Sequence, residues 1–422
     1  MSGNPAITKK IISTSVGIFS LKILGVVLGV AVSWVLTKQL SVEEFGKYTL
    51  ILSLFQVFFP VFCFGLPDVL VRGTSVAHSN NDERKKMGMF HLAKKGTLIS
   101  SIAVCLLIIA FDFLSVDYME GLPLLVLMPC LFYLRSLMLG FRMVVTSQLG
   151  ETIFLPITFL FFILVFISGF DCSLTAEEIV LLRVAAVLVS VIGALILLVR
   201  AHGLKSQRCP GEPVDLTRSM AYFVSIGLLD MLIKNAEVLA LGAMVGNEPV
   251  AIFRIAFLIV SLVAFVPFAF NSLVGPEIAK SFSERDFEKV NHLNTLGARL
   301  SVGVIMLLVI GIYLIGGHIL ELVFGSAYKE SYDLVLIMCG GLVLAELLGS
   351  VCLTLNMTGN ENLSVYGLIV GVIVSLVMNV MLIPAYGLYG CAIANVVSLL
   401  VCRIVLWILL YKKTGIRSGI LA

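Results

Sequence analysis

Seven ionisable side chains interrupt long apolar runs of the sequence, and they are the residues best placed to do chemistry. Four are cationic and three are acidic: Lys22, Arg135, Lys234 and Arg403, and then Asp230, Glu237 and Glu346. Inserting a charge at the centre of a bilayer costs at least about 2.5–3.5 kcal/mol, so such a residue usually faces a cavity or a partner. We predict that the cations bind a substrate and that the acids bind a coupling proton or cation.

The first apolar run carries Lys22 near its centre. Gly25 and Gly29 fall on the same helical face as this lysine, as do Ser15 and Ser33. The two glycines form a GxxxG pair, which permits a second helix to approach closely. This pattern favours a lysine that lines a substrate cavity. The alternative is a lysine that is paired structurally with a neighbouring acid.

The seventh apolar run carries three charges at helical spacing. Asp230, Lys234 and Glu237 lie on one face of the predicted helix. Asp230 and Lys234 can pair, which leaves Glu237 as a carboxylate able to bind and release a proton. A purely structural network explains the same spacing equally well. Because Lys22 and Lys234 occupy corresponding runs in the two halves of the chain, the pattern also predicts a shared cavity.

The remaining three charges each have two interpretations. Glu346 is either a site for a coupling ion or a partner for Arg403 or Lys22. Arg135 and Arg403 carry guanidinium groups, which can bind phosphate oxygens through two hydrogen bonds. Alternatively, each arginine extends toward the cytoplasmic interface and contacts no substrate.

The composition shows which elements must position these charges. Of 422 residues, 59% are hydrophobic and 13% are charged, whereas a soluble domain has about 25% charged residues. Apolar runs of about 20 residues match a hydrocarbon core about 30 Å thick. We therefore predict an all-α polytopic membrane protein.

Several classes of function are excluded by the same inspection. The net charge of +3 and the lack of a basic patch argue against a nucleic-acid partner. Nine cysteines without a CxxC pair, and five histidines in loops or at span ends, predict neither a disulfide framework nor a metal site. No catalytic motif or cofactor-binding motif is present. The sequence therefore predicts a transporter and not an enzyme.

Twelve membrane-spanning helices are predicted. Their limits are Ile11–Leu36, Phe45–Phe64, Gly96–Leu114, Leu122–Leu139, Ile153–Phe170, Val180–Val199, Met220–Met244, Ala251–Leu273, Leu300–Leu320, Leu334–Leu355, Ser364–Ile383 and Cys391–Leu410. Twenty of the 29 Lys and Arg residues lie in one set of loops and five in the opposite set. Because basic residues accumulate on the cytoplasmic side, we predict that both termini are cytoplasmic.

The spans divide into two similar halves. Pro67-Asp68 and Pro276-Glu277 each follow the second span of a half, at corresponding positions. We predict an N-terminal six-helix lobe at residues 1–205, a cytoplasmic linker at residues 206–219 and a C-terminal six-helix lobe at residues 220–422. Transporters built from such repeats commonly bind their substrate between the repeats.

Three short strings carry a resemblance to a known family. Residues 40–48 read LSVEEFGKY, residues 324–328 read FGSAY, and residues 382–394, preceded by Asn379, read LIPAYGLYGCAIA. Together they resemble the Wzx-type polysaccharide flippases, which are grouped with the MATE multidrug exporters and the lipid II flippases. In the third string Pro384 is expected to end a helix, and Gly387 and Gly390 to form a tight periplasmic turn. Cys391 stands where alanine is usual in the family.

The resemblance implies a MATE-like fold in which two six-helix bundles form a V around a cavity that opens alternately to each side. It implies a lipid-linked oligosaccharide substrate, undecaprenyl pyrophosphate carrying an O-antigen or related repeat unit, moved to the periplasmic leaflet of the bacterial inner membrane. Membrane lipid, a proton or sodium counter-ion, and polysaccharide polymerase or chain-length assembly proteins are the implied partners. The site residues named above follow from mid-membrane charge and not from a family motif.

Two alternative functions stay open. A MATE-like exporter of cationic drugs would need an acidic cavity, whereas four mid-membrane cations against three acids favour an anionic substrate. A membrane-embedded glycosyltransferase or polymerase generally has a long periplasmic loop, and every predicted outward loop is short.

Overall fold

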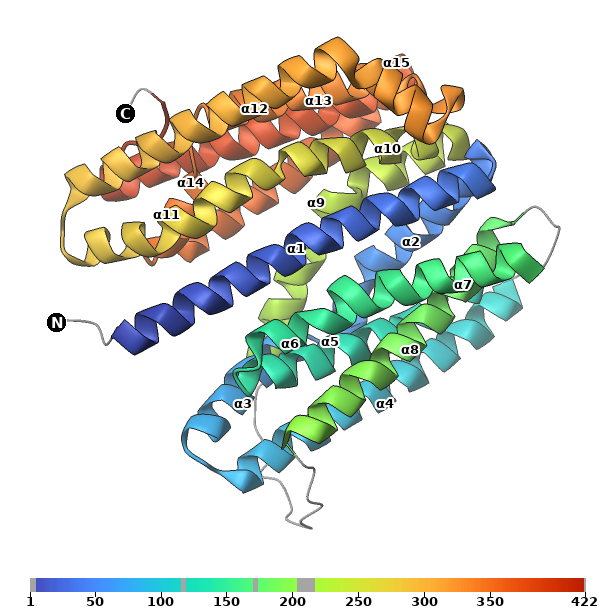
Figure 1. Cartoon of the computed structure of the whole chain (residues 1–422), viewed down its shortest axis with the longest axis horizontal. Helices are drawn as coiled ribbons and strands as arrows, with labels where there is room; N and C mark the ends of the chain where they lie inside the picture. The colour runs from blue at the N-terminus through green and yellow to red at the C-terminus, as the bar shows by residue number, and fades with distance from the viewer. Residues whose placement is uncertain (1–4, 115–118, 170–173, 203–216, 421–422) are drawn as a thin grey trace. The chain divides into compact units, whose positions relative to one another are not determined.

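The chain folds into helices that group into two compact units. A computed structural model describes residues 5–114, 119–169, 174–202 and 217–420, and these form helices with no strand (Figure 1). The units are Met1–Leu40 with Ile51–Met231, and Ser41–Leu50 with Leu232–Ala422. The all-α membrane fold predicted from the sequence is confirmed. Most of the predicted linker, residues 206–216, lies outside the described residues.

The first unit contains the helices of the N-terminal part of the chain. They are α1 (Pro5–Gln39), α2 (Val42–Phe62), α3 (Leu66–Ser79), α4 (Glu83–Leu114), the 3-10 turn η1 (Met119–Gly121), α5 (Leu124–Gly140), α6 (Val144–Leu149), the π-helical turn η2 (Gly150–Phe154), α7 (Leu155–Gly169), α8 (Ala176–His202) and the start of α9 (Thr217–Met244). The first nine residues of α2 belong to the second unit, because the boundary between the units falls after Leu50.

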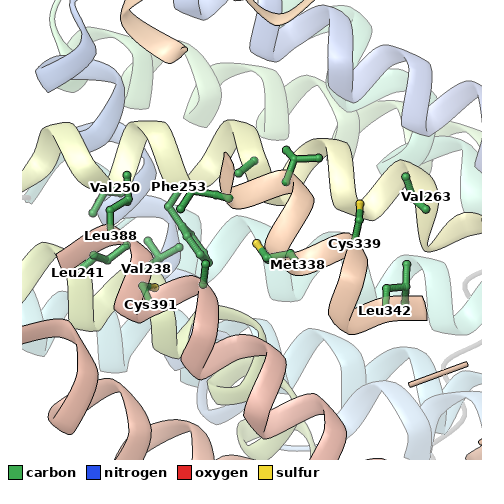
Figure 2. Packing of buried hydrophobic residues seen from close by; sticks show 14 of the residues in the cluster. Val238, Leu241, Val250, Phe253, Val263, Met338, Cys339, Leu342, Leu388 and Cys391 are labelled. Carbon is green, nitrogen blue, oxygen red and sulfur yellow. The ribbon is translucent and has the colours of Figure 1, made fainter. Parts of the chain in front are cut away.

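The second unit contains the remaining helices. They are the end of α9, α10 (Asn247–Val263), α11 (Phe265–Ser283), α12 (Phe287–Phe324), the 3-10 turn η3 (Ser326–Tyr328), α13 (Ser331–Glu346), α14 (Val351–Met357) and α15 (Glu361–Thr414). Figure 2 shows its core, where Phe253 and Met338 lie among apolar side chains from α9, α10, α13 and α15.

Apolar side chains also cover much of the outside of these helices, as expected of a protein whose solvent is lipid. Leu307 and Leu322 on α12 are 71% and 82% exposed, and Leu106 on α4 is 62% exposed. Among the described residues, eight helices are long and apolar enough to cross a membrane, or nine if the bent pair α13–α14 counts as one span. The total of twelve spans stays a prediction.

Local sequence signals explain where several helices begin. Asp82 precedes α4, and its carboxylate accepts a hydrogen bond of 3.0 Å from the backbone N–H of Lys85, which lowers the pKa of Asp82. Thr175 and Glu178 form a reciprocal capping box at the start of α8. Asp286 caps α12 by accepting from the backbone N–H of Lys289. These caps satisfy N–H groups that have no partner within the helix.

The turn predicted in the third string occurs inside one long helical segment. Gly387 in α15 has a non-helical backbone (φ 55°, ψ −125°), so two helices meet there. A Cβ on Gly390 would lie 2.2 Å from the carbonyl oxygen of Leu382, so only glycine fits this reversal. Pro384 lies within α15 and does not end it, which corrects the expectation that this proline is the helix stop.

Candidate functional site

Arg135 is held by an acid within the first unit. Its Nη1 atom donates to Oε2 of Glu151 over 2.5 Å. Arg135 lies on α5 and Glu151 lies in the π-helical turn η2, between α6 and α7. The guanidinium carbon also lies 5.3 Å from the centre of the Phe132 ring, one helical turn before it on α5. This ring and this carboxylate fix where the guanidinium points.

Lys22 on α1 belongs to the same cluster. The charges of Arg135 and Glu151 both act on its ammonium group. The packing of α1 explains the proximity, since a Cβ on Gly25 would lie 2.4 Å from the Cγ2 methyl of Thr152, the residue after Glu151. The first half of the GxxxG pair thus contacts η2. A Cβ on Gly29 would meet no atom of the described residues within 4 Å.

We call Lys22, Arg135 and Glu151 the cation cluster. It contains two positive groups and one negative group, and the side chains of Arg135 and Glu151 are 29% and 37% exposed. A cavity of about 10 Å³ adjoins the ion pair and is lined by Phe132, Thr146, Ser147 and Gly150 among others. With an excess of positive charge, partial exposure and adjoining space, the cluster can accept an anionic group.

Glu151 is the functional candidate that the sequence did not reveal. The sequence places the start of a span at Ile153, which leaves Glu151 in a loop, where a carboxylate reads as solvated charge. In the structure α6, η2 and α7 are continuous, and Val144–Gly169 qualifies as one span. Glu151 is therefore a charge inside a span and not in a loop. The run from Val144 onward carries small and neutral polar residues but no charge other than Glu151 up to Gly169, and this is the signal that could have revealed it.

Glu237 anchors a polar cluster in the second unit. Its side chain is 3% exposed, and Oε1 accepts from Nδ2 of Asn395 over 3.1 Å and from Oγ of Ser375 over 3.4 Å. Asn379 donates through Nδ2 to the Ser375 hydroxyl over 3.2 Å, and its Oδ1 atom is buried and has no partner among the described residues. We call these four residues the oxygen cluster. They come from α9 and from both limbs of α15.

The oxygen cluster has the chemistry of a site for a small hard cation. Carboxylate, amide and hydroxyl oxygens are the ligands that such cations prefer. A buried carboxylate must be protonated, paired or bound to a cation. The spacing of Ser375, Asn379 and Asn395 was not recognised in the sequence as part of a site, because three neutral polar residues in apolar runs resemble ordinary helix-packing residues.

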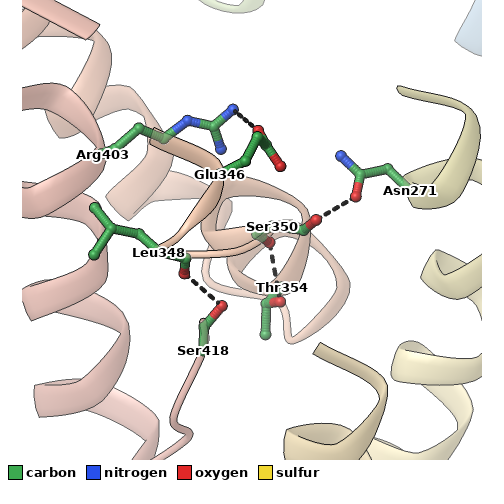
Figure 3. Close-up of polar contacts among 7 residues, drawn as sticks. All are labelled: Asn271, Glu346, Leu348, Ser350, Thr354, Arg403 and Ser418. Atoms are coloured by element: carbon green, nitrogen blue, oxygen red, sulfur yellow. Dashed lines mark hydrogen bonds and ion pairs between the residues drawn. The ribbon is translucent and has the colours of Figure 1, made fainter. Parts of the chain in front are cut away.

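Glu346 and Arg403 form the third group, in the second unit (Figure 3). Nη2 of Arg403 donates to Oε1 of Glu346 over 3.4 Å. Glu346 is 1% exposed, and its Oε2 atom has no partner among the described residues. It is the last residue of α13, before a 43° bend to α14. Of the two interpretations of Glu346, the structure displays the ion pair with Arg403.

The bend beside this pair is held by polar contacts (Figure 3). The hydroxyl of Ser350 donates to the side-chain oxygen of Asn271, and the hydroxyl of Ser418 donates to the carbonyl oxygen of Leu348 over 3.0 Å. The backbone N–H of Ile420 donates to the carbonyl oxygen of Leu347 over 3.1 Å. The segment after α15 thus satisfies carbonyl groups that the break in the helix leaves open.

Asp230 and Lys234 complete the sequence-predicted set. Both lie on α9, with Asp230 in the part assigned to the first unit and Lys234 in the part assigned to the second. Lys234 is exposed and Asp230 is half-buried. Their pairing stays a prediction, as does a cavity shared by Lys22 and Lys234.

Comparison with known proteins places the chain among membrane proteins of glycan biosynthesis. Residues 7–282 match a family described as polysaccharide biosynthesis protein. A segment of 162 residues is 20% identical to the probable low-salt glycan biosynthesis flippase Agl15 of Haloferax volcanii, and it covers 38% of this chain and 34% of that protein. The matched segment thus spans about a third of that relative's length.

Solved structures show the same fold over nearly the whole chain. A multidrug resistance MATE family transporter of the MOP superfamily, in an inward-facing conformation, superposes with a TM-score of 0.72 at 14% identity, over 95% of this chain and 99% of the other. The lipid II flippase MurJ gives 0.66 at 13% identity over 94% and 87%. A MOP superfamily transporter from Pyrococcus furiosus gives 0.65 at 15% identity over 95% of each chain.

Proposed function

Because the chain belongs to the polysaccharide biosynthesis protein family, we propose that it is a flippase that moves a lipid-linked glycan across a membrane by alternating access. The observation that carries the proposal is the cation cluster, where Lys22 and Arg135 lie together on helices of one unit. A flippase must draw the polar head of a lipid through a region of low dielectric constant. Positive charge in such a region attracts an anionic head group far more strongly than in water.

The substrate proposed in detail is undecaprenyl pyrophosphate carrying an O-antigen or related repeat unit, moved from the cytoplasmic to the periplasmic leaflet of the bacterial inner membrane. A pyrophosphate group joins the lipid to the sugar. Arg135 can bind its oxygens through bidentate hydrogen bonds, and Lys22 adds a second positive charge. Lys234 is exposed on α9 and is proposed as a further contact. Arg403 is proposed as the fourth contact, and it ranks below Arg135 because its partner Glu346 is only 1% exposed, which leaves less room for an anion beside the pair.

Coupling to a proton or sodium gradient is proposed at the oxygen cluster. Glu237 can hold a proton, or it can bind a sodium ion together with oxygens of Ser375, Asn379 and Asn395. Asp230 is retained as a second candidate for coupling. Glu346 is a less suitable one, since Arg403 neutralises it. Polysaccharide polymerase and chain-length assembly proteins are the proposed partners, and both termini are proposed to be cytoplasmic.

The two other functions make different demands on the cation cluster. An exporter of cationic drugs would place excess negative charge at its site, whereas the cluster holds two cations and one acid. A glycosyltransferase or polymerase would form a glycosidic bond, which transport does not. Both alternatives are therefore separable from the proposal by experiment.

Complementation of a polysaccharide flippase null strain tests the proposal. The strain would carry the glycan-biosynthesis genes that accompany this protein. Surface polysaccharide would be scored, and the amount of each variant in the membrane would be confirmed. We expect the wild type to restore polysaccharide, and Lys22→Gln together with Arg135→Gln to reduce it at least about tenfold, because two charge-assisted contacts to the anion are lost. Arg142→Gln is the matched control, since Arg142 is exposed and donates to Ser79 outside the cluster.

The wild-type result and the variant result answer different questions. A wild type that leaves the strain without surface polysaccharide, although present at normal level, would refute the flippase function. A double variant that restores as much polysaccharide as the wild type would refute the cation cluster as the substrate site and leave the flippase function standing.

A further inference from the structure

The pair Arg135–Glu151 differs from the pair Arg403–Glu346 in how accessible its acid is to a ligand. The side chains of Arg135 and Glu151 are 29% and 37% exposed. In the pair Arg403–Glu346 the arginine is 22% exposed, close to Arg135, but the glutamate is only 1% exposed, so the difference lies in the acid. A buried pair is a fixed structural element, because separating it leaves an uncompensated charge. A half-exposed pair can exchange one partner for another anion at much lower cost.

We propose that Glu151 is a resident counter-ion of the substrate site: its carboxylate occupies, in the empty protein, the position on Arg135 that the anionic group of the lipid-linked substrate takes on binding. This inference rests on the proposed function and extends it, because it assigns a role to a residue other than the cations. Glu151 acts through Arg135 and is therefore a positioning residue. It sets how tightly the anion is held and how readily it leaves.

The backbone around Glu151 suits a side chain that must move. Glu151 lies in η2, a single π-helical turn of five residues inserted between α6 and α7. Such turns are rare, and they occur frequently at functional sites. The cavity of about 10 Å³ beside the pair is lined by Glu151 itself together with Thr146 and Ser147. It supplies space, of the order of one water molecule, next to the carboxylate.

The charges of the cluster explain why a counter-ion is useful. Lys22 and Arg135 would hold a pyrophosphate strongly if no acid were present, because both charges act in a medium of low dielectric constant. Strong binding on one side of a membrane would slow release on the other side. When Glu151 competes for Arg135, the anion binds less tightly, and the carboxylate replaces it as it leaves. Removal of the carboxylate should therefore strengthen binding and slow turnover together.

The test measures binding and transport on the same full-length protein. Binding of farnesyl pyrophosphate, a short prenyl pyrophosphate, would be measured by titration calorimetry on the chain in lipid nanodiscs, with farnesol as the uncharged control. Inorganic pyrophosphate in a parallel titration separates recognition of the anion from recognition of the lipid. Transport would be followed as surface polysaccharide in the complemented strain.

We expect Glu151→Gln to bind farnesyl pyrophosphate about three- to tenfold more tightly than the wild type, because a competing charge is removed. The same variant should yield less surface polysaccharide. Glu151→Asp keeps the charge and should restore both values toward the wild type. Glu83→Gln is the matched control, since it removes an exposed carboxylate that pairs with Lys86, outside the cluster.

Each outcome distinguishes the inference from the proposed function. If Arg135→Gln weakens binding of farnesyl pyrophosphate, the probe binds through Arg135. Unchanged or weaker binding by Glu151→Gln would then overturn the counter-ion role alone. A parallel loss of binding and transport in Glu151→Gln and Glu151→Asp assigns Glu151 a structural role, which also overturns it. If Arg135→Gln binds farnesyl pyrophosphate as well as the wild type does, the cation cluster is not the substrate site. The proposed function then loses the structural observation on which it rests.

Discussion

Glu237, Glu346 and Glu151 are three glutamates that interrupt helices rich in apolar residues, and each is stabilised in a different way. Glu237 accepts hydrogen bonds from neutral side chains, Glu346 is paired with an arginine at a helix break, and Glu151 is paired with an arginine beside open space. A carboxylate that receives only neutral hydrogen bonds keeps the need for a proton or a cation. Among the three, Glu237 is therefore the residue that we assign to coupling.

Replacement of Glu237 with Gln tests this assignment. The amide keeps the size of the side chain and removes the charge that a proton or sodium ion would neutralise. We expect an imposed sodium or proton gradient to accelerate glycan-lipid transport by the wild type in proteoliposomes, and to leave the variant at its rate without a gradient. Cys391→Ala is the matched control, because the Cys391 thiol donates to the backbone carbonyl of Glu237 and not to its carboxylate. Full gradient stimulation in Glu237→Gln would contradict the assignment.

The sequence was informative about the cations and less so about their partners. Lys22 and Arg135 were identified because a single basic residue in an apolar run is costly and therefore conspicuous. Glu151 was missed because hydropathy marks the start of a span poorly where polar residues occupy the first turns of a helix. The oxygen cluster was missed, apart from Glu237, because the reversal at Gly387 brings Asn379 and Asn395 together and spacing alone does not show it.

At the scale of elements, the contact of α1 with η2 positions the cation cluster. The GxxxG pair in α1 predicted a close helix contact, and in the structure Gly25 makes one with Thr152. Lys22 lies one turn before Gly25 on the same face of α1. The contact at Gly25 therefore sets the position of Lys22 along the helix axis relative to Glu151. The distance between the two cations thus depends on the absence of a side chain at residue 25.

A larger residue at position 25 should separate the elements that hold the cluster. We expect Gly25→Leu to displace Thr152 and to destabilise the protein by about 1–3 kcal/mol, the usual cost of overpacking, with loss of anion binding. Gly29→Leu is the matched control on the same helix, where a new Cβ meets no atom of the described residues within 4 Å. Thermal unfolding and farnesyl pyrophosphate titration of both variants provide the measurement. Equal effects at the two positions would contradict the role of the Gly25 contact.

Helix breaks are the elements that the sequence predicted only in part. The reversal near Gly387 was expected from its glycines, although Pro384 continues the helix where a stop was predicted. The bend between α13 and α14 was not expected, because residues 334–355 read as one apolar run. The hydrogen bonds that stabilise this bend come from Asn271 and Ser418, which are distant in sequence. Patterns within a short stretch of sequence do not reveal such long-range hydrogen bonds.

At the scale of the molecule, the fold is that of the MATE and MurJ structures, and the two units each carry a distinct charged group. The first unit contains the cation cluster, with an excess of positive charge. The second unit contains the oxygen cluster, whose only ionisable member is an acid. Our proposal therefore assigns binding of the anionic head group to the first unit and binding of a driving ion to the second. The twelve spans and the cytoplasmic termini remain predictions for the chain as a whole.

Direct measurement of lipid movement tests the central claim most sharply. Purified protein would be reconstituted into liposomes whose inner and outer leaflets both contain fluorescent undecaprenyl-pyrophosphate-linked glycan, and access of an external glycosidase to the inner pool would be followed over time. We predict that the wild type exposes the inner pool, and that Lys22→Gln together with Arg135→Gln slows this at least about tenfold. An inner pool that stays protected with the wild type, as in liposomes without protein, would contradict the account.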